Sequence, residues 1–430
     1  YANKITLNGG TLQATASFSL HQYYSTTLGA NNGFIDVGDS YVLTYPAAIS
    51  GSGGMGKTGT GTLLLTGSNT FAGTLTNSAG TVQIGNNGTA GSIAANVVNN
   101  AALVWYRSDS VEYSAAISGT GTLTKNGAGV LTLSGVNTYS GNTTVGGGTL
   151  LVSGSAANSA VSVSSGATLM GDGPVGALTV TGTVDPGNSA AARADLACGA
   201  LTLNNGGAIR VDISNVSGTA GTEWDLISSS GAIAANASGT FTIKLYGTPT
   251  GFSSSSSYSW KIMGGTSVSD FSAGRFAVDT NNFLSATAGG TFAVAHVGDD
   301  IVLTFTPGIP DAPVSFSATA TGPSTIQLAF TKNANGDGLV IVYNTTGSFE
   351  VPADEVPGVG DTFAGGTVVY VGGTSPQNHT GLTGCRQYYY KAWSHNGTVY
   401  SASGLTDDDT TTTPAAPATV WAGETNNTSF

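Results

Sequence analysis

One stretch of the sequence gathers the residue types that sugar-binding and catalytic sites use. Residues 105–113 read WYRSDSVEY, so two aromatic side chains stand beside an arginine and an aspartate. On a strand, alternation separates Arg107 and Asp109 from Tyr106. An aromatic ring beside charged groups can stack on a sugar ring, so Trp105 and Tyr106 are candidate contacts for a glycan or a partner protein. The alternative is a solvated ion pair between Arg107 and Asp109.

The other acidic residues favour turns and solvent over chemistry. Asp36 and Asp39 have the spacing of paired glycosidase acids, but they lie among glycine and serine, and Asp185 lies in the turn-like VDPGNS. Residues 333–338 read NANGDG, which half-matches a calcium loop, although residue 344 is Asn where that loop needs Glu. The aspartate run at 407–409 indicates a solvated surface, with a surface calcium ion as the alternative.

Sequence motifs for catalysis and cofactors are absent. The four histidines are dispersed, and none pairs with Cys or an acid at metal-ligand spacing. The sequence contains no G-x-S-x-G, H-E-x-x-H or phosphate-loop motif. We therefore expect no cofactor, no metal and no enzymatic activity, and keep a polysaccharide-degrading enzyme on a β-helix as a remote alternative.

Charge and composition exclude two classes of partner and favour strands. The 430 residues carry a net charge of −12 with only 12 Lys and Arg, so there is no basic stripe for a nucleic acid. No apolar run approaches the roughly 20 residues of a membrane helix. Glycine is abundant, at 64 residues, and the apolar residues recur in short alternating runs. That pattern is typical of strands that turn at glycine.

A long segment of similar sequence occurs twice, 68 residues apart. The shift aligns Tyr45 with Tyr113, and it also aligns the pairs Lys57 and Lys125, Asn69 and Asn137, and Phe71 and Tyr139. A fixed period indicates a repeat architecture, and this one fits about three solenoid turns of some 22 to 23 residues. Leucines alternate with threonines in short runs bounded by glycine, which predicts a parallel β-solenoid with leucine inside.

The repeated phrase also resembles a known family. Its pattern, G-x-G-x-L-x-K-x-G-x-G-x-L-x-L-x-G-x-N-T-[FY]-x-G, is similar to the autotransporter-associated β-strand repeat of bacterial surface proteins, with Met55 where leucine is usual. The resemblance covers residues 1–306. It implies a right-handed parallel β-helix, of about 13 turns if each turn has some 23 residues. It further implies an extracellular location, at the cell surface or secreted, and no enzymatic activity.

The sequence pattern changes near residue 307. Proline-rich linker residues precede alternating strands over residues 307–413, which predicts an antiparallel β-sandwich. Leu382 lies six residues before Tyr388, a spacing that resembles the tyrosine corner of fibronectin type III domains, although Phe330 stands where that family usually has Trp. If this domain binds a glycan or a partner, its aromatic contact is expected to be Trp393.

Residues 414–430 read as the start of a further module or as a donor-like strand. The candidate assembly segment includes Pro414, Val420, Trp421 and Phe430. Pairing of such a strand with another copy would build a head-to-tail filament. We therefore expect a structural protein, a subunit of a surface filament, matrix or adhesive appendage, whose partners are copies of itself and a surface polysaccharide. The alternative is a surface adhesin or a carbohydrate-binding stalk.

Overall fold

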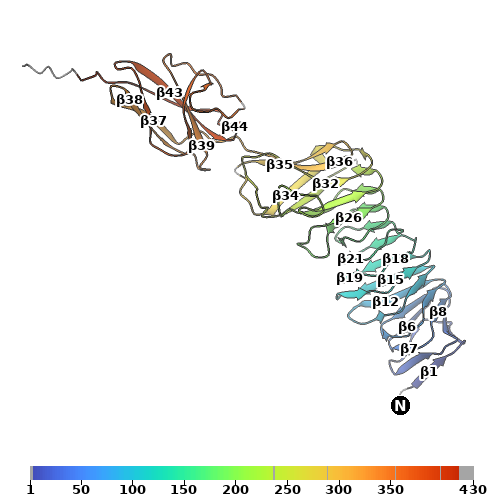
Figure 1. Ribbon diagram of the computed structural model, residues 1–430. Coiled ribbons are helices and arrows are strands. Elements are labelled where there is room, and N and C mark those ends of the chain that lie inside the picture. The colour runs from blue at the N-terminus through green and yellow to red at the C-terminus, as the bar shows by residue number, and fades with distance from the viewer. Residues whose placement is uncertain (1–2, 236–237, 288, 354, 398, 416–430) are drawn as a thin grey trace, which may run out of the picture. The chain divides into compact units, whose positions relative to one another are not determined.

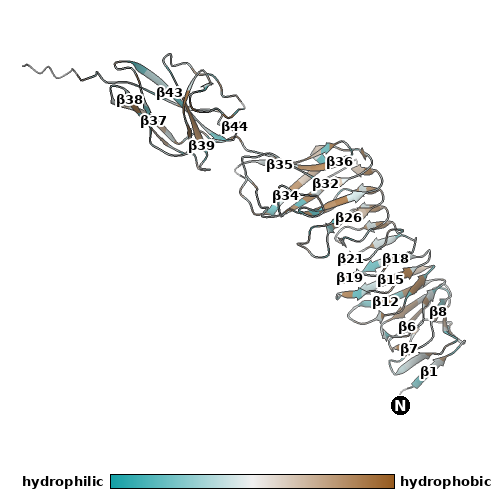
Figure 2. Ribbon diagram, viewed as in Figure 1, coloured by the Kyte–Doolittle hydropathy of each residue, from teal (hydrophilic) through white to brown (hydrophobic). Residues whose placement is uncertain are grey.

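The computed structural model describes residues 3–235, 238–287, 289–353, 355–397 and 399–415 (Figure 1). Within these ranges the protein is all-β, with a single 3-10 turn at Ala273–Arg275. The chain divides into two compact units; the main division falls between Phe305 and Thr306, and the short segments Ser253–Ser257 and Ala286–Thr291 group with the second unit. Strands of both units mix hydrophobic and hydrophilic residues (Figure 2), as expected where one face of a sheet is buried.

The first unit is a parallel β-solenoid whose coils cross three faces in turn. On the first face the strands form a sheet of three, a pair and a sheet of eight. These strands are β1 (Asn3–Leu7), β4 (Tyr24–Leu28), β7 (Ile49–Gly51), β10 (Ser68–Asn69), β13 (Ser92–Ile93), β16 (Val111–Tyr113), β19 (Val130–Leu133), β21 (Thr149–Val152), β23 (Thr168–Gly171), β25 (Thr183–Pro186), β28 (Ala208–Asp212), β31 (Phe241–Gly247) and β34 (Phe276–Phe283).

The second face begins with a sheet of six strands and ends with three strands of a mixed sheet. These are β2 (Thr11–Ala14), β5 (Gly33–Val37), β8 (Met55–Thr58), β11 (Leu75–Asn77), β14 (Val97–Asn99), β17 (Ile117–Ser118), β26 (Asp195–Cys198), β29 (Leu226–Ser229) and β32 (Tyr258–Gly264).

The third face is one continuous parallel sheet of twelve strands. They are β3 (Phe18–Ser19), β6 (Val42–Tyr45), β9 (Thr62–Leu65), β12 (Thr81–Gly88), β15 (Ala102–Arg107), β18 (Thr122–Asn126), β20 (Thr143–Val145), β22 (Val161–Val163), β24 (Leu178–Val180), β27 (Leu201–Leu203), β30 (Ile233–Ala235) and β33 (Val268–Ser269). The prediction of a parallel solenoid is confirmed, whereas its right-handed winding stays a prediction.

Columns of like residues in adjacent coils form the core. Leu43, Leu63, Val82, Leu103 and Leu123 stack directly on one another, and all are buried. Their spacing makes these coils 19 to 21 residues long, shorter than the 22 to 23 expected. The glycine corners keep the turns tight: Gly127 has a φ of +81°, and a Cβ there would collide with the carbonyl of Arg107 in the preceding coil.

Because the coils are short, the 68-residue repeat overshoots three turns. Lys57 lies on β8 of the second face and pairs with Asn77, which pairs with Asn99 one coil further on. Three turns from Lys57 therefore end near Gly119, and the remaining residues carry the chain to Lys125 on β18 of the third face. Each repeat thus advances by three turns and one face, so equivalent residues of the two copies point in different directions.

The later coils are longer, and an antiparallel hairpin follows them. Leu201, Ile233 and Val268 stack with 32 and 35 residues between neighbours. Strand β32 pairs with β36 (Asp300–Thr306). β36 in turn lies beside β35 (Thr291–Val297), the strand at the edge of the sheet. An aromatic cluster packs in this part of the solenoid and includes Phe252, Tyr258, Trp260, Phe283, Phe292 and Phe305.

The second unit consists of two antiparallel sheets. One contains β37 (Ser315–Gly322), β38 (Thr325–Thr331) and β42 (Gln377–Thr380). The other contains β39 (Gly338–Asn344), β40 (Thr362–Phe363), β41 (Gly366–Gly372), β43 (Gln387–Asn396), β44 (Val399–Tyr400) and β45 (Leu405–Thr410). Residues of both sheets, such as Ile326 and Leu328 from β38 and Tyr390 from β43, share one hydrophobic cluster.

The Tyr388 hydroxyl binds upstream backbone in the way that the Leu–Tyr spacing predicts. The backbone N–H of Thr383 donates to it at 2.9 Å, and Leu382 packs in the same cluster as the Tyr388 ring. This is the hydrogen bond of a tyrosine corner. The fibronectin type III assignment of residues 307–413 itself stays a prediction.

Candidate functional site

The lysine of each repeat is buried and bound by three backbone carbonyl groups. Lys57 Nζ donates to the oxygens of Thr58 and Gly59, both at 2.7 Å, and to that of Ala79 in the next coil at 3.0 Å. Lys125 Nζ makes the same three bonds, at 2.9 to 3.1 Å, to the residues 68 positions further on, which are Asn126, Gly127 and Gly147. Burial lowers the pKa of both lysines to about 8.

The asparagine of each repeat connects three coils. Its Oδ1 accepts from the backbone N–H of the preceding coil, at Ile49 for Asn69 and at Ile117 for Asn137. Its Nδ2 donates to a carbonyl of its own coil and to one of the following coil; for Asn69 these belong to Gly67 and Ser92. The lysine and the asparagine of each repeat therefore serve the stacking of coils, and neither is left over for a substrate.

The strand that contains Trp105 does not form the expected aromatic site. Trp105 is only 2 % exposed and packs against Tyr113, with 4.9 Å between ring centroids. The expectation that Trp105 contacts a glycan or a partner is wrong, because its side chain points into the core, as that of Leu103 does two residues earlier on β15. Tyr106 is partly exposed, and its role as a contact stays a prediction.

Arg107 and Asp109 form the ion pair of the alternative interpretation. Two guanidinium nitrogens reach the two oxygens of Asp109 at 2.9 and 2.7 Å. The same guanidinium donates to the carbonyls of Thr89 and Gly91, so it also holds the loop after β12. The Arg107 side chain is 11 % exposed, which makes it a structural clamp rather than a free surface charge.

A cluster of charges that the sequence did not reveal lies on the first face. Arg210 binds both oxygens of Asp212, at 2.6 and 3.0 Å, and its guanidinium carbon lies 3.9 Å from the centroid of the Tyr246 ring. Asp185 lies 3.9 Å from Arg210 Nε and is buried in β25, so its placement in a turn was wrong. Burial raises the pKa of Asp185 to about 6. The R-x-D spacing was the available signal, as it was for Arg107.

Asp225 joins this cluster from a neighbouring loop and is fully buried. It accepts hydrogen bonds from the backbone N–H groups of Ala194, at 3.0 Å, and Asp212, at 2.7 Å. Burial raises its pKa to about 8, against the two N–H donors, which favour the carboxylate. Arg210, Asp212 and Asp225 bind one another or backbone, and Asp185 Oδ1 is buried 3.9 Å from Arg210 without a hydrogen bond, so we assign the cluster a structural role.

The remaining acids also bind protein groups. Asp36 lies in strand β5, not in a turn, and accepts from Gln13 and Thr58. In the second unit, Asp407 and Asp409 accept from the backbone N–H groups of Ala318 and Ala320, so β45 covers the free edge of β37. Of the acidic run expected to be solvated at 407–409, Asp407 and Asp409 therefore bridge the two sheets, whereas Asp408 is exposed and accepts from Gln387.

Trp393 is buried, contrary to the expectation of a surface contact. It is 2 % exposed and lies in a second cluster, on the outer side of β39 and β43, together with Phe363 and Tyr400. Strand alternation does point it away from the main core, but the long segment after β39 covers it, with Phe349 at 6.3 Å between ring centroids. Pro414 is exposed, whereas Val420, Trp421 and Phe430 lie outside the described residues.

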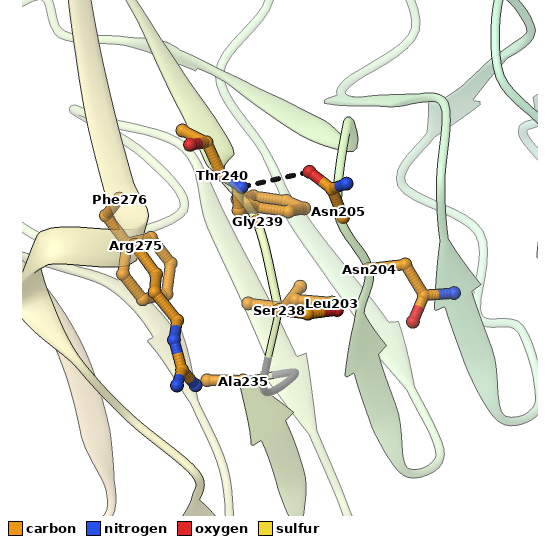
Figure 3. A pocket seen from close by; sticks show the side chains of 10 residues that line it. Leu203, Asn204, Asn205, Ala235, Ser238, Gly239, Thr240, Arg275 and Phe276 are labelled. Atoms are coloured by element: carbon orange, nitrogen blue, oxygen red, sulfur yellow. Dashed lines mark hydrogen bonds between the residues drawn. The ribbon is translucent and has the colours of Figure 1, made fainter.

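The hollow beside β31 offers little catalytic chemistry. It has a volume of about 10 Å³ (Figure 3); Asn205 there accepts from the Thr240 backbone N–H at 2.9 Å, and Arg275 and Phe276 form one side. It is large enough for little more than a water molecule. Within the described ranges, no group of three or more His, Cys, Asp or Glu is arranged to hold a metal ion.

Comparison with known proteins agrees with this geometry. The Passenger-associated-transport-repeat model matches residues 56–84 and 123–152, the two copies described above. The first unit is thus a parallel β-solenoid that carries autotransporter-associated repeats, as in bacterial passenger domains. Among curated proteins, the chain is 38 % identical over 125 residues to the adhesin BmaC autotransporter of Brucella suis biovar 1 (strain 1330). That match covers 29 % of this chain and 4 % of the adhesin.

Solved structures similar to this chain include two fibronectin-type domains, titled "Structure of FN3tt mut" and "Crystal Structure of FN3tt". Their TM-scores are 0.19 and 0.18, with 16 % and 18 % identity. Each match covers 24 % of this chain, and 99 % and 96 % of the respective structure. In the described part of the chain, no helix has the length and apolar character needed to cross a bilayer.

Proposed function

We propose that this chain is a non-enzymatic, extracellular part of a bacterial surface adhesin, in which the solenoid is a rigid stalk that presents its outer faces. The observation that carries the proposal is how the repeat uses its polar residues. Lys57, Lys125, Asn69 and Asn137 bind backbone of adjacent coils. Such a ladder spreads stability along the stack. The similarity to an autotransporter adhesin supports the adhesive role.

Adhesion of coated beads tests this function. Beads that carry the full chain are expected to adhere to cultured epithelial cells or to plates coated with bacterial exopolysaccharide, more than albumin-coated beads do. Adhesion to neither surface would contradict the proposal. The enzymatic alternative predicts that the soluble chain releases new reducing ends from that exopolysaccharide, and such release would replace the adhesin proposal.

Head-to-tail assembly into a filament is a second candidate function. Strand β42 lies at the edge of its sheet and pairs with β38 alone among the described strands, in contrast to the covered edge of β37. An edge of this kind can accept a strand from another chain. The donor would be the segment 414–430 with Trp421. Electron microscopy of concentrated protein is expected to show fibres that Trp421→Asp abolishes, and a strictly monomeric wild type would exclude the filament.

A further inference from the structure

A hollow of about 160 Å³ lies on the second face of the solenoid, across three adjacent coils. Phe34 on β5, Gly56 on β8 and Thr76 on β11 pair in register, and their inward neighbours Ile35, Lys57 and Asn77 are buried. The row of Phe34 therefore faces outward. A cavity of about 150 Å³ in another protein holds one benzene ring, so this hollow has room for one six-membered ring.

The Phe34 ring forms one wall of the hollow and is open to a ligand. The ring is 37 % exposed. A Cβ placed on Gly56 would lie 2.5 Å from its Cδ1 and 2.8 Å from its Cε1, so the ring lies over the bare backbone of β8. One side of the aromatic group is thus supported by the sheet, which fixes its orientation.

Uncharged hydrogen-bonding groups surround the ring. Thr74, Thr76 and Ser78 line the hollow from the coil of β11, and Asn32 lines it from the coil of β5, next to Phe34. Asn32 uses its Oδ1 to accept from the Gly54 N–H at 2.7 Å, which leaves the two Nδ2 protons to point elsewhere. Within the described part of the chain, no hydrogen bond to another protein group is recorded for the hydroxyls of Thr74, Thr76 and Ser78.

Taken together, an aromatic wall and a ring of hydroxyl and amide groups fit one class of ligand. A pyranose presents an apolar C–H face that stacks on an aromatic ring and hydroxyls that exchange hydrogen bonds with Thr, Ser and Asn. All the lining residues are uncharged, and the Asp36 carboxylate on the same face binds Thr58 at 3.3 Å. A negative neighbour without a lining cation disfavours uronic acids and other anionic sugars.

We propose that this hollow is a binding subsite for a neutral pyranose unit of a polysaccharide, with Phe34 as the stacking residue and Gly56 as the residue that makes room. This subsite rests on the proposed adhesive function and names a ligand for it. The second repeat supplies an internal comparison: Thr124 occupies the position of Gly56 and pairs with Val104 instead of a phenylalanine.

Saturation-transfer difference NMR with the full chain tests the subsite. The probes are millimolar methyl β-D-glucopyranoside and methyl β-D-galactopyranoside, with methyl β-D-glucopyranosiduronate as the anionic comparison. We expect saturation of the ring C–H protons of at least one neutral probe and a weaker signal from the uronate. Phe34→Ala and Gly56→Thr are expected to weaken binding about tenfold, the loss that accompanies removal of one aromatic contact.

Two further variants separate a lost subsite from a damaged fold. Val104→Ala, on the strand that pairs with the second repeat at Thr124, is the matched control and is expected to leave probe binding unchanged. The double variant Val104→Phe with Thr124→Gly transplants the pair and is expected to raise the saturation signal. The subsite is overturned if the wild type saturates neither neutral probe, if Phe34→Ala binds as tightly as the wild type, or if the transplant gains nothing.

Bead adhesion distinguishes this inference from the proposed function. Beads coated with Phe34→Ala that adhere to exopolysaccharide like the wild type would leave the adhesin proposal intact and remove the subsite from it. If Phe34→Ala loses both adhesion to exopolysaccharide and binding of the pyranosides, the subsite accounts for the adhesion. Pyranoside binding by a wild type that adheres to no surface would keep the subsite and remove the adhesin proposal.

Discussion

Lys57 and Lys125 bind equivalent carbonyl groups 68 residues apart, but the neighbouring outward residues differ, since Gly56 in the first repeat corresponds to Thr124 in the second. Inside the solenoid, Lys57, Lys125 and the asparagines of the repeat bind backbone groups of adjacent coils, and few residue types can do so. Outside, the same strands face solvent and their side chains can vary. The repeat is therefore constrained from within, and differences in binding belong to its outer residues.

The largest effect is expected from the buried lysines. Lys57→Met and Lys125→Met each leave three carbonyl oxygens without their donor, and unpaired buried groups cost about 1 to 3 kcal/mol each. Relief of the buried charge offsets part of this, so we expect each variant to lose on the order of 3 kcal/mol of unfolding free energy. Guanidinium unfolding followed by circular dichroism measures it. Clearly unequal losses would break the equivalence of the two repeats.

A smaller loss is expected from the asparagines that connect coils. Asn69→Ala and Asn137→Ala each remove three hydrogen bonds, one of them to the backbone N–H of the preceding coil. We expect each to lower the free energy of unfolding by about 2 kcal/mol. Ser162→Ala, on the exposed side of β22, is the control and should be neutral within about 0.5 kcal/mol. An asparagine variant as stable as this control would contradict the role assigned to the residue.

The pH dependence of stability follows from the same lysines. Their pKa is about 8 in the folded protein and 10.5 when unperturbed, so between these values the unfolded chain binds more protons. Stability must then rise with pH above 8, by about 1 kcal/mol for each lysine up to roughly pH 9, less a smaller opposing contribution from Asp225, whose pKa is about 8. Beyond that, burial of Cys198, whose pKa is raised to about 11, acts in the opposite direction. The double variant Lys57→Met, Lys125→Met should show no rise; a rise of unchanged size would assign it to other groups.

The smallest effect concerns one of the interior positions where the repeats differ, Phe71 in the first copy and Tyr139 in the second. Tyr139 is buried and its hydroxyl lies 2.6 Å from Thr143 Oγ1, whereas the first repeat has Phe71 there. Tyr139→Phe gives the second copy the residue of the first at this position and is expected to cost less than about 1 kcal/mol, because Thr143 keeps a bond to Ser159. Thermal unfolding would detect a larger loss, which would mean that the two interiors are not interchangeable.

Much of the solenoid could be predicted from the alternation of inward and outward residues and from the 68-residue period of the repeat. Lys125 follows Leu123 by two residues, so alternation alone places both inside, and the same rule applied to Leu103 would have placed Trp105 inside. The face on which Lys125 lies could not be predicted, because an error of two or three residues per coil accumulates to one face over three coils. Register between coils depends on packing that one sequence does not display.

Sites that depend on distant residues were also beyond prediction. Asp225 reaches the N–H groups of Ala194 and Asp212 across 31 and 13 residues, which no local pattern encodes. Trp393 is covered by a segment that precedes it by some forty residues, as the position of Phe349 shows. By contrast, the Tyr388 hydrogen bond spans five residues and was predictable from its spacing.

The extra face gained with every repeat has a consequence for how such a rod meets its surroundings. If three copies followed one another at this period, they would advance about ten turns, roughly 48 Å, before the starting side came round again. A given outward position of the repeat would then occur on each of the three faces in turn. A flat target contacts only one face of the rod, so equivalent positions of neighbouring copies cannot bind it at the same time. Multivalent binding then requires a ligand that winds around the rod.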